Sequence, residues 1–268
     1  MADFTLNKDA DGIATITWDV ADKSMNVMSF EGLETLNALV DDVLADDAVK
    51  GVVITSGKDT FAGGMDLNLL AKMKEEAGDN PAKGLFDGTM KMHGLLRKIE
   101  RAGMDPKTNK GGKPIAAALP GTAAGIGLEL PLATHRIFLA NNPKAKVGLP
   151  EIMVGIFPGA GGTTRRVRKL GAMGASPLLL EGKMRSPDKA KGTLVDEVVD
   201  DPVAAAREWV LNAKDADLVK PWDAKGYKMP GGAPYHPAGF MTFVGASAMV
   251  NGKNTGDYPA DKALLSDV

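Results

Sequence analysis

The chain contains no cysteine, no large excess of charge of either sign and no long apolar run. Without cysteine it can form no disulfide, no thiolate metal site and no cysteine nucleophile. Its 32 basic and 34 acidic side chains leave a net charge of -2, so it lacks both the basic footprint of nucleic-acid binding and a polybasic membrane signal. No apolar stretch approaches the roughly 18 residues that span a bilayer. We therefore expect no nucleic-acid partner and no membrane span.

The rest of the composition is typical of a globular protein. Hydrophobic residues make up 44% and charged residues 25% of the 268 positions, which is enough to bury a large core. The first residues, Met-Ala-Asp-Phe-Thr-Leu-Asn-Lys-Asp, contain neither the basic nor the apolar segment of a secretory signal. This favours a cytoplasmic location.

Short apolar strands alternate with amphipathic helices along most of the chain. Residues 29–44 carry leucine and valine at helical spacing, and Ser29 is placed to cap that helix. Alternation of this kind indicates crossover units and a largely parallel or mixed sheet, hence an α/β fold. The predicted strands are 4–6, 12–18, 49–56, 114–119, 137–140 and 194–199, and the predicted helices include 29–44, 65–74, 85–101, 128–133 and 163–170.

The sequence changes character after Asp215. Residues 221–237 are rich in proline, glycine and tyrosine, which is typical of an extended loop. We therefore divide the chain into a core domain of residues 1–214 and a Pro/Gly-rich extension of residues 215–268. This extension is expected to pack on the core or to lead into a further segment.

Glycine-bearing turns recur where predicted strands end, at residues 61–67, 121–127 and 158–163. Glycine lets the backbone approach a ligand closely, and a helix that starts there directs unpaired N–H groups towards it. Such turns can bind negative charge without lysine or arginine. A single turn of this kind is more often structural, so only the three together indicate a site.

Two acids stand beside these turns in apolar surroundings. Glu129 lies in Gly-Ile-Gly-Leu-Glu-Leu and Glu151 in Val-Gly-Leu-Pro-Glu-Ile. Burial raises the pKa of a carboxyl group, and a neighbouring acid separates the pKa values of a pair, so two such acids can serve as general acid and base. The simpler alternatives are a helix N-terminal acid stabilised by the dipole for Glu129 and a solvated loop acid for Glu151.

Several familiar motifs fail on spacing. The Gly125-Ile126-Gly127 turn lacks the third glycine of a dinucleotide fingerprint, no Gly-Lys-Ser/Thr follows Gly159, and no Gly-x-Ser-x-Gly elbow occurs. Three isolated histidines show no metal-ligand pattern and are interpreted as surface or structural residues: His93, His135 and His236. We expect no metal.

The remaining motifs resemble those of the crotonase (enoyl-CoA hydratase/isomerase) superfamily. Residues 56–67, 113–130 and 149–163 are similar to its three signatures and occur in family order. The resemblance covers roughly residues 4–213 and is greatest to the N-terminal hydratase part of the multifunctional α chain of the bacterial fatty-acid oxidation complex. It implies an α/β fold built as a spiral of repeated ββα units.

The resemblance also implies roles for residues by position. The backbone N–H groups of Met65 and Ile126 correspond to an oxyanion hole, Glu151 to the proton donor, Glu129 to the acid that positions water, and Gly159 to the helix N-terminus directed at the thioester. Residues in or beside segments that hold coenzyme A are Lys23, Ser24, Met25, Ala62, Gly63, Gly64, Asp66, Leu67, Gly125 and Pro150.

The implied activity is hydration of 2-enoyl-CoA thioesters in β-oxidation, with no cofactor other than the coenzyme A that belongs to the substrate. Two alternatives stay open: isomerisation of 3-enoyl-CoA to 2-enoyl-CoA, and a non-catalytic acyl-CoA-binding or assembly module. The resemblance further implies a homo-oligomer, by family a trimer, or a place in a larger β-oxidation complex. A stand-alone protein and a fragment of a multifunctional protein both fit the sequence.

Two further groups of side chains stand out. A basic face on the predicted helix 163–170 is interpreted as solvated rather than as a grip on coenzyme A phosphates, and it comprises Arg165, Arg166, Arg168 and Lys169. Four methionines are candidates to line an adaptable acyl tunnel, namely Met65, Met73, Met90 and Met92.

Overall fold

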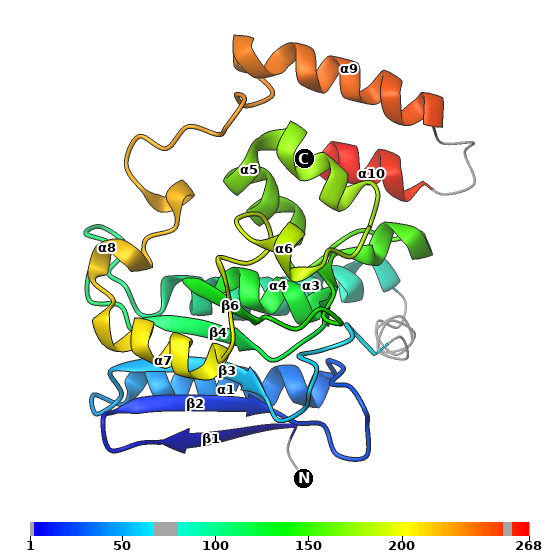
Figure 1. Ribbon diagram of the computed structural model, residues 1–268. Helices are drawn as coiled ribbons and strands as arrows, with labels where there is room; N and C mark the ends of the chain where they lie inside the picture. The colour runs from blue at the N-terminus through cyan, green and yellow to red at the C-terminus, as the bar shows by residue number, and fades with distance from the viewer. Residues whose placement is uncertain (1–2, 67–79, 254–258, 268) are drawn as a thin grey trace.

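The computed structural model describes residues 3–66, 80–253 and 259–267. Six strands form the main sheet (Figure 1), in the order β1 (Phe4–Lys8), β2 (Ile13–Trp18), β3 (Gly51–Ser56), β4 (Ile115–Leu119), β6 (Arg136–Ala140) and β8 (Glu197–Val199). The β1–β2 pair is antiparallel and the other pairs are parallel. Two short strands, β5 (Ala123–Ala124) and β7 (Val147–Gly148), pair in parallel as a separate small sheet.

Helices connect most of these strands. Those that follow the first strands are α1 (Phe30–Ala45), α3 (Pro81–Arg101) and α4 (Ile126–Ala133). The middle of the chain forms the 3-10 helix η1 (Pro150–Val154), α5 (Gly162–Leu179), α6 (Pro187–Ala190) and α7 (Pro202–Asn212). The last part forms α8 (Asp215–Leu218), the 3-10 helix η2 (Pro221–Asp223), α9 (Pro237–Lys253) and α10 (Ala260–Asp267).

Both faces of the main sheet are covered. Because side chains alternate along a strand, Val52 and Ile54 of β3 enter the larger core, whereas Val53 points to the opposite face. That second face packs against Ala206 and Val210 of α7. Figure 1 shows α7 in front of the sheet and α1 behind it. The central strands β3 and β4 are therefore buried on both sides, which explains their nearly continuous apolar sequences.

Local capping signals set the starts of α1 and α3, and the cap of α1 is the one that the sequence predicts. The hydroxyl of Ser29 accepts a hydrogen bond of 2.9 Å from the N–H of Gly32, which confirms Ser29 as the N-cap of α1. Helix α3 starts after Asn80, whose side chain accepts from the N–H of Lys83. It ends at Ala102, which takes the left-handed conformation that closes many helices.

The α/β prediction is confirmed, and the differences from it are local. The short strands β5 and β7 were not predicted. The predicted helix 65–74 lies almost wholly outside the described residues. The extension of residues 215–268 was predicted as Pro/Gly-rich, with an extended loop at residues 221–237, and its helices α9 and α10 were not predicted. Three glycines and apolar residues without a helical period hide α9 in the sequence.

The extension contacts the core at several points, among them the ion pair of Asp223 with Arg97 and the last helix, α10. Leu264 of α10 is 1% exposed and belongs to the larger core cluster. Figure 1 shows α9 at the outer end of the molecule, beyond α5 and α10. Within the described ranges, no helix combines the length and the apolar character needed to cross a bilayer.

Candidate active site

Glu129 lies on α4, a helix whose eight residues are all buried. The helix starts after Gly125, which has φ 55°, a conformation that glycine adopts without the strain of a side chain. The Glu129 side chain is only 2% exposed. Its Oε1 accepts hydrogen bonds from the backbone N–H groups of Ala160, at 2.9 Å, and Gly162, at 2.7 Å. The carboxyl is thus fixed by main-chain donors rather than by a surface cation.

Two opposing effects set the proton affinity of Glu129. Burial removes water from the carboxylate and raises its pKa to about 7. The hydrogen bonds from Gly162 and Ala160 and the positive charge of Arg165 oppose this rise. The carboxyl therefore changes its protonation state near neutral pH, as a general acid or base must.

Glu151 is held in a different way. It is the second residue of η1 and is partly buried, and its Oε1 lies 3.2 Å from the point where a Cβ on Gly125 would stand. Its Oε2 is buried without a hydrogen-bond partner among the described residues. Burial, followed by the negative charge of Glu129, raises the Glu151 pKa to about 8. Both predicted acids therefore meet in one site, which rules out the solvated loop acid for Glu151.

The first two glycine-bearing turns lie against each other beside these acids. The N–H of Ala124 donates to the carbonyl of Ala62 at 3.0 Å, and Ala62 and Ala123 pair as a parallel bridge. A Cβ on Gly125 would stand 3.7 Å from the Cα of Gly64. The two turns are therefore in van der Waals contact.

The two residues predicted to form the oxyanion hole lie within these turns. Met65 pairs with Met28 in a parallel bridge made by the flanking residues, and Ile126 is the first residue of α4. Within the described part of the chain, neither the N–H of Met65 nor that of Ile126 donates to another group.

The segments predicted to hold coenzyme A are adjacent to each other. The N–H of Gly63 donates to the carbonyl of Asn26 at 2.8 Å, and the sulfur of Met25 covers Gly63 at 2.6 Å from the position of a Cβ. Lys23 reaches Asp66 at 3.4 Å. Ser24 is exposed in the same loop, and the predicted residue Leu67 lies outside the described residues.

The buried amide of Asn26 ties this loop to the sheet. It donates to the carbonyls of Trp18 and Phe61 and to the hydroxyl of Ser56, each at 2.9 Å. Its oxygen accepts from the N–H of Val20 at the same distance. The loop therefore has a fixed place at the carboxyl ends of β2 and β3.

The third turn differs in detail from the prediction. Pro150 is the first residue of η1 and adjoins Glu151, as predicted. Gly159 is exposed and precedes Gly161, the N-cap of α5, by two positions. The N–H groups of Ala160 and Gly162 bind Glu129, a contact that was not predicted although the same Pro-Gly-Ala-Gly-Gly motif contains both residues.

The interpretation of a solvated basic face on α5 is wrong for its first two arginines. Arg165 and Arg166 are 7% and 3% exposed. The Nε of Arg165 pairs with Glu100 at 3.0 Å, and one terminal nitrogen donates to the carbonyl of Ala160 at 3.1 Å. Arg166 donates to the carbonyl of Thr193. The sequence showed a run of cations, but the buried carboxylate that pairs with Arg165 lies 65 positions away on α3.

His135 and His93 each contact a backbone group. His135 accepts from the N–H of Ile115 at 2.9 Å, and burial lowers its pKa to about 3, which fits a structural role. His93 contacts the carbonyl of Gly159. In the parts of the chain that the structure describes, no cluster of three or more His, Asp or Glu side chains has the arrangement of a metal site.

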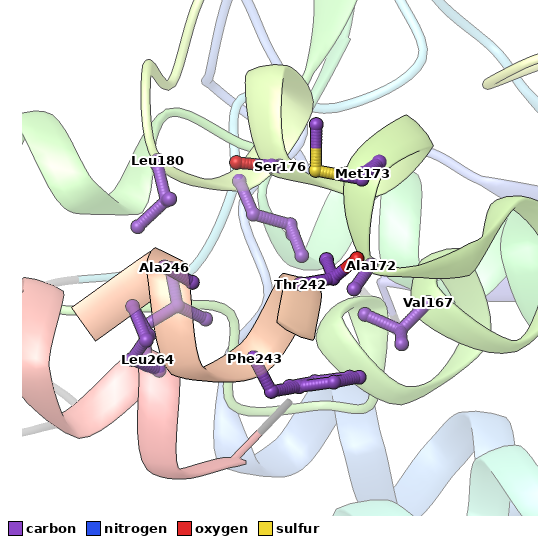
Figure 2. Close-up of a pocket in the computed structure, with 11 residues that line it drawn as sticks. Val167, Ala172, Met173, Ser176, Leu180, Thr242, Phe243, Ala246 and Leu264 are labelled. Carbon is purple, nitrogen blue, oxygen red and sulfur yellow. The ribbon is translucent and has the colours of Figure 1, made fainter. Parts of the chain in front are cut away.

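An apolar cavity lies between α5 and the C-terminal helices (Figure 2). It adjoins a wider hollow of about 480 Å³ that shares Met173, Ser176 and Leu180. The far end of α5 meets η1, since a Cβ on Gly182 would come within 2.9 Å of Ile152 and Met153. The cavity therefore adjoins the segment that contacts η1, the helix that carries Glu151. The methionines predicted for an acyl tunnel do not line it: Met65, Met90 and Met92 lie elsewhere, and Met73 is outside the described residues.

Known proteins are similar to this chain in sequence and architecture. A family model described as enoyl-CoA hydratase/isomerase matches residues 8–217. The fatty acid oxidation complex subunit alpha of Shewanella loihica is 32% identical over 272 residues, which cover 99% of this chain and 36% of that protein. The same subunit of Shewanella frigidimarina is 33% identical over 220 residues, covering 81% and 29%. The chain thus spans about a third of the length of these curated relatives.

Solved structures give the same fold. An enoyl-CoA hydratase from Bacillus anthracis superposes with a TM-score of 0.61 at 26% identity, covering 78% of this chain and 74% of that one. An enoyl-CoA hydratase from Thermoplasma volcanium, at 24% identity, has a TM-score of 0.63 and covers 100% of this chain and 92% of that one. The predicted crotonase-type α/β fold is confirmed.

Proposed function

This chain belongs to the enoyl-CoA hydratase/isomerase family, and we propose that it adds water to 2-enoyl-CoA thioesters in fatty-acid oxidation. The pair Glu129 and Glu151 carries the proposal. Burial raises both pKa values to near neutrality, and the charge of one acid raises the pKa of the other. Between the two values the pair holds one proton, so one member can donate while the other accepts.

In the proposed reaction Glu151 starts protonated and Glu129 ionised. Glu129, fixed by Ala160 and Gly162, aligns a water molecule and accepts one of its protons as the water oxygen bonds to C3 of the substrate. The C2–C3 π electrons move towards the thioester, and Glu151 delivers its proton to C2. The product gains H at C2 and OH at C3, and the acid pair still holds one proton.

The negative charge that develops on the thioester oxygen needs donors. The N–H groups of Met65 and Ile126 lie at the ends of two turns that touch each other, and neither is used within the described part of the chain. Preorganised donors of this kind are worth about 3 kcal/mol each in other enzymes. We assign them the oxyanion, and we assign the adjacent loops that carry Lys23 and Gly63 to coenzyme A.

The acyl chain is assigned to the apolar cavity between α5 and α9. Its walls are apolar side chains such as Val167, Phe243 and Leu264 (Figure 2), and the segment that follows α5 contacts η1 at Gly182. Apolar walls favour an alkyl chain through burial of its surface. The reaction as proposed uses no cofactor and no metal.

The direct test is the loss of absorbance at the enoyl thioester band with 2-enoyl-CoA substrates of graded length. Saturable hydration to 3-hydroxyacyl-CoA supports the proposal. Binding of acyl-CoA in calorimetry, with no turnover of 2-enoyl or 3-enoyl substrates, would identify a non-catalytic binding or assembly module instead.

Isomerisation is the second candidate, because the family description includes it and because Glu151 has an oxygen free to remove and return a proton. After mixing with 3-enoyl-CoA, mass spectrometry detects added water and absorbance at the enoyl thioester band detects the shifted double bond, so the two measurements together separate the two reactions. A product of unchanged mass with the shifted double bond indicates isomerase activity, whereas a gain of one water indicates that hydration follows.

The setting of the reaction is proposed from the relatives. They are alpha subunits of a fatty acid oxidation complex, and this chain matches about a third of their length. We propose a cytoplasmic enzyme that acts within such a complex or as a homo-oligomer, by family a trimer.

A further inference from the structure

A histidine on α3 reaches the turn that holds Glu129. The Nε2 of His93 lies 2.6 Å from the carbonyl oxygen of Gly159. A carbonyl oxygen only accepts, so Nε2 carries the hydrogen and donates it. The side chain is partly exposed, unlike the buried groups around Glu129.

The same peptide group also meets Glu129. The carbonyl of Gly159 and the N–H of Ala160 belong to one peptide bond, and the described chain has no cis peptide bonds. In a planar trans peptide the C=O and N–H point in opposite directions. His93 therefore holds one end of this group while the Oε1 of Glu129 accepts from the other end at 2.9 Å. Donation to the carbonyl also strengthens the N–H as a donor, because successive hydrogen bonds polarise one another.

A second side chain binds the next peptide group of the turn. Arg165 donates to the carbonyl of Ala160 at 3.1 Å and is itself held by Glu100 at 3.0 Å. The turn between Gly159 and Gly162 is rich in glycine, which gives its backbone more conformational freedom than other residues would. Contacts on its outer side therefore decide where its N–H groups point.

The outer side of the turn opens to solvent. His93 and Arg165 line a cavity of about 400 Å³ together with Arg97, Arg168 and Trp222. His93 can therefore be replaced without opening the core, whereas removing Arg165 would leave the buried charge of Glu100 with one partner fewer.

We propose that His93 is a positioning residue that acts on Glu129 through the Gly159–Ala160 peptide group. This inference rests on the proposed function, in which Glu129 aligns water in its ionised form. Donation from His93 keeps the Ala160 N–H directed at the carboxylate, and that hydrogen bond favours the ionised form. The other charged groups that act on Glu129 are Arg165, which favours ionisation, and Glu151, which opposes it.

The test compares His93→Leu, which lacks the donor, with His93→Gln, whose amide N–H can still donate. Loss of the donor weakens the bond to the carboxylate, so the pKa of Glu129 rises further. We expect the acidic limb of kcat/KM to move to higher pH by roughly half a unit in His93→Leu, with KM for the substrate unchanged. His93→Gln should restore most of the profile. The matched control is His236→Leu, which changes an exposed histidine on the C-terminal extension.

A measurement without turnover keeps this inference separate from the proposed function. The pKa of the Glu129 carboxyl is followed by NMR in protein labelled with ¹³C at glutamate side chains, with Glu129→Gln used to assign the signal. A higher pKa in His93→Leu, reversed in His93→Gln, supports the positioning role even if no enoyl-CoA is hydrated. An identical titration in folded His93→Leu and wild-type protein overturns it, as does a shift of equal size in His236→Leu.

Discussion

Helix α4 and the 3-10 helix η1 carry the same kind of side chain in opposite ways. Every residue of α4 is buried, and Glu129 is tied to two backbone N–H groups. No residue of η1 is fully buried, and the Oε2 of Glu151 has no partner among the described residues. A fixed acceptor suits the alignment of water, whereas an acid with a free oxygen suits proton delivery. Both acids are glutamates, so it is their hydrogen bonding that distinguishes the two proposed roles.

The strongest test of this division is Glu151→Gln. Glutamine keeps the shape of the side chain but cannot deliver the proton, so we expect hydration to fall about a thousandfold. Binding of a saturated acyl-CoA, measured by calorimetry, should survive. Glu208→Gln, at an exposed site on α7, serves as the control. Unchanged turnover in Glu151→Gln would exclude Glu151 as the proton donor.

The next largest effect concerns the pH dependence of stability. The folded-state pKa of Glu129 is raised from 4.5 to about 7, so its favourable contribution is complete below pH 4.5 and is lost as the pH rises through 7. Glu129→Gln removes this titration. We expect its free energy of unfolding, relative to wild type, to improve by on the order of 3 kcal/mol between pH 4.5 and pH 8.

Urea denaturation at several pH values measures this change. Glu151→Gln should flatten the same part of the stability curve, because burial also raises the folded-state pKa of Glu151. A difference between Glu129→Gln and wild type that stays constant from pH 4.5 to pH 8 would show that folding does not raise the pKa of Glu129.

The smallest of the three effects comes from Gly125, which caps the helix of Glu129 and lies beside the carboxyl of Glu151. Gly125→Ala would place a Cβ 3.2 Å from the Oε1 of Glu151 at a residue with φ 55°. We expect a loss of roughly 1–2 kcal/mol in stability from the positive φ, and about a tenfold loss of hydration from the displaced carboxyl. Both are measurable in one preparation by urea denaturation and the absorbance assay.

Gly192→Ala is the matched control. Gly192 also has a positive φ, of 79°, but a Cβ there would have no atom within 4 Å. It should lose similar stability and keep its activity. Equal activity in the two variants would mean that contact with Gly125 does not position Glu151.

The features that could be predicted from the sequence are those whose cause is local. Ser29 caps α1 because its hydroxyl meets the N–H of Gly32 three residues on, and that signal is contained in the sequence of the helix start. The glycine turns and the apolar context of Glu129 and Glu151 were equally visible. The alternation of apolar strands and amphipathic helices predicted the α/β fold, and the apolar context of the two acids marked them as candidates.

The features that were missed depend on distant partners. Arg165 looked solvated because a run of cations usually is, yet Glu100 on α3 makes its burial possible. His93 looked isolated because its partner, the carbonyl of Gly159, is 66 residues away. Helix α9 was missed because its three glycines and all-round apolar residues give no period.

By itself the sequence determined which backbone turns could form and which two carboxyl groups would leave water, because conformational freedom, capping and hydrophobic spacing act over a few residues. Tertiary structure decided what each carboxyl touches. The N–H groups on Glu129, the free oxygen of Glu151 and the contacts behind the Gly159–Gly162 turn all arise where segments tens of residues apart pack together. Proton affinity follows from burial and from these contacts, and both are properties of the packed molecule.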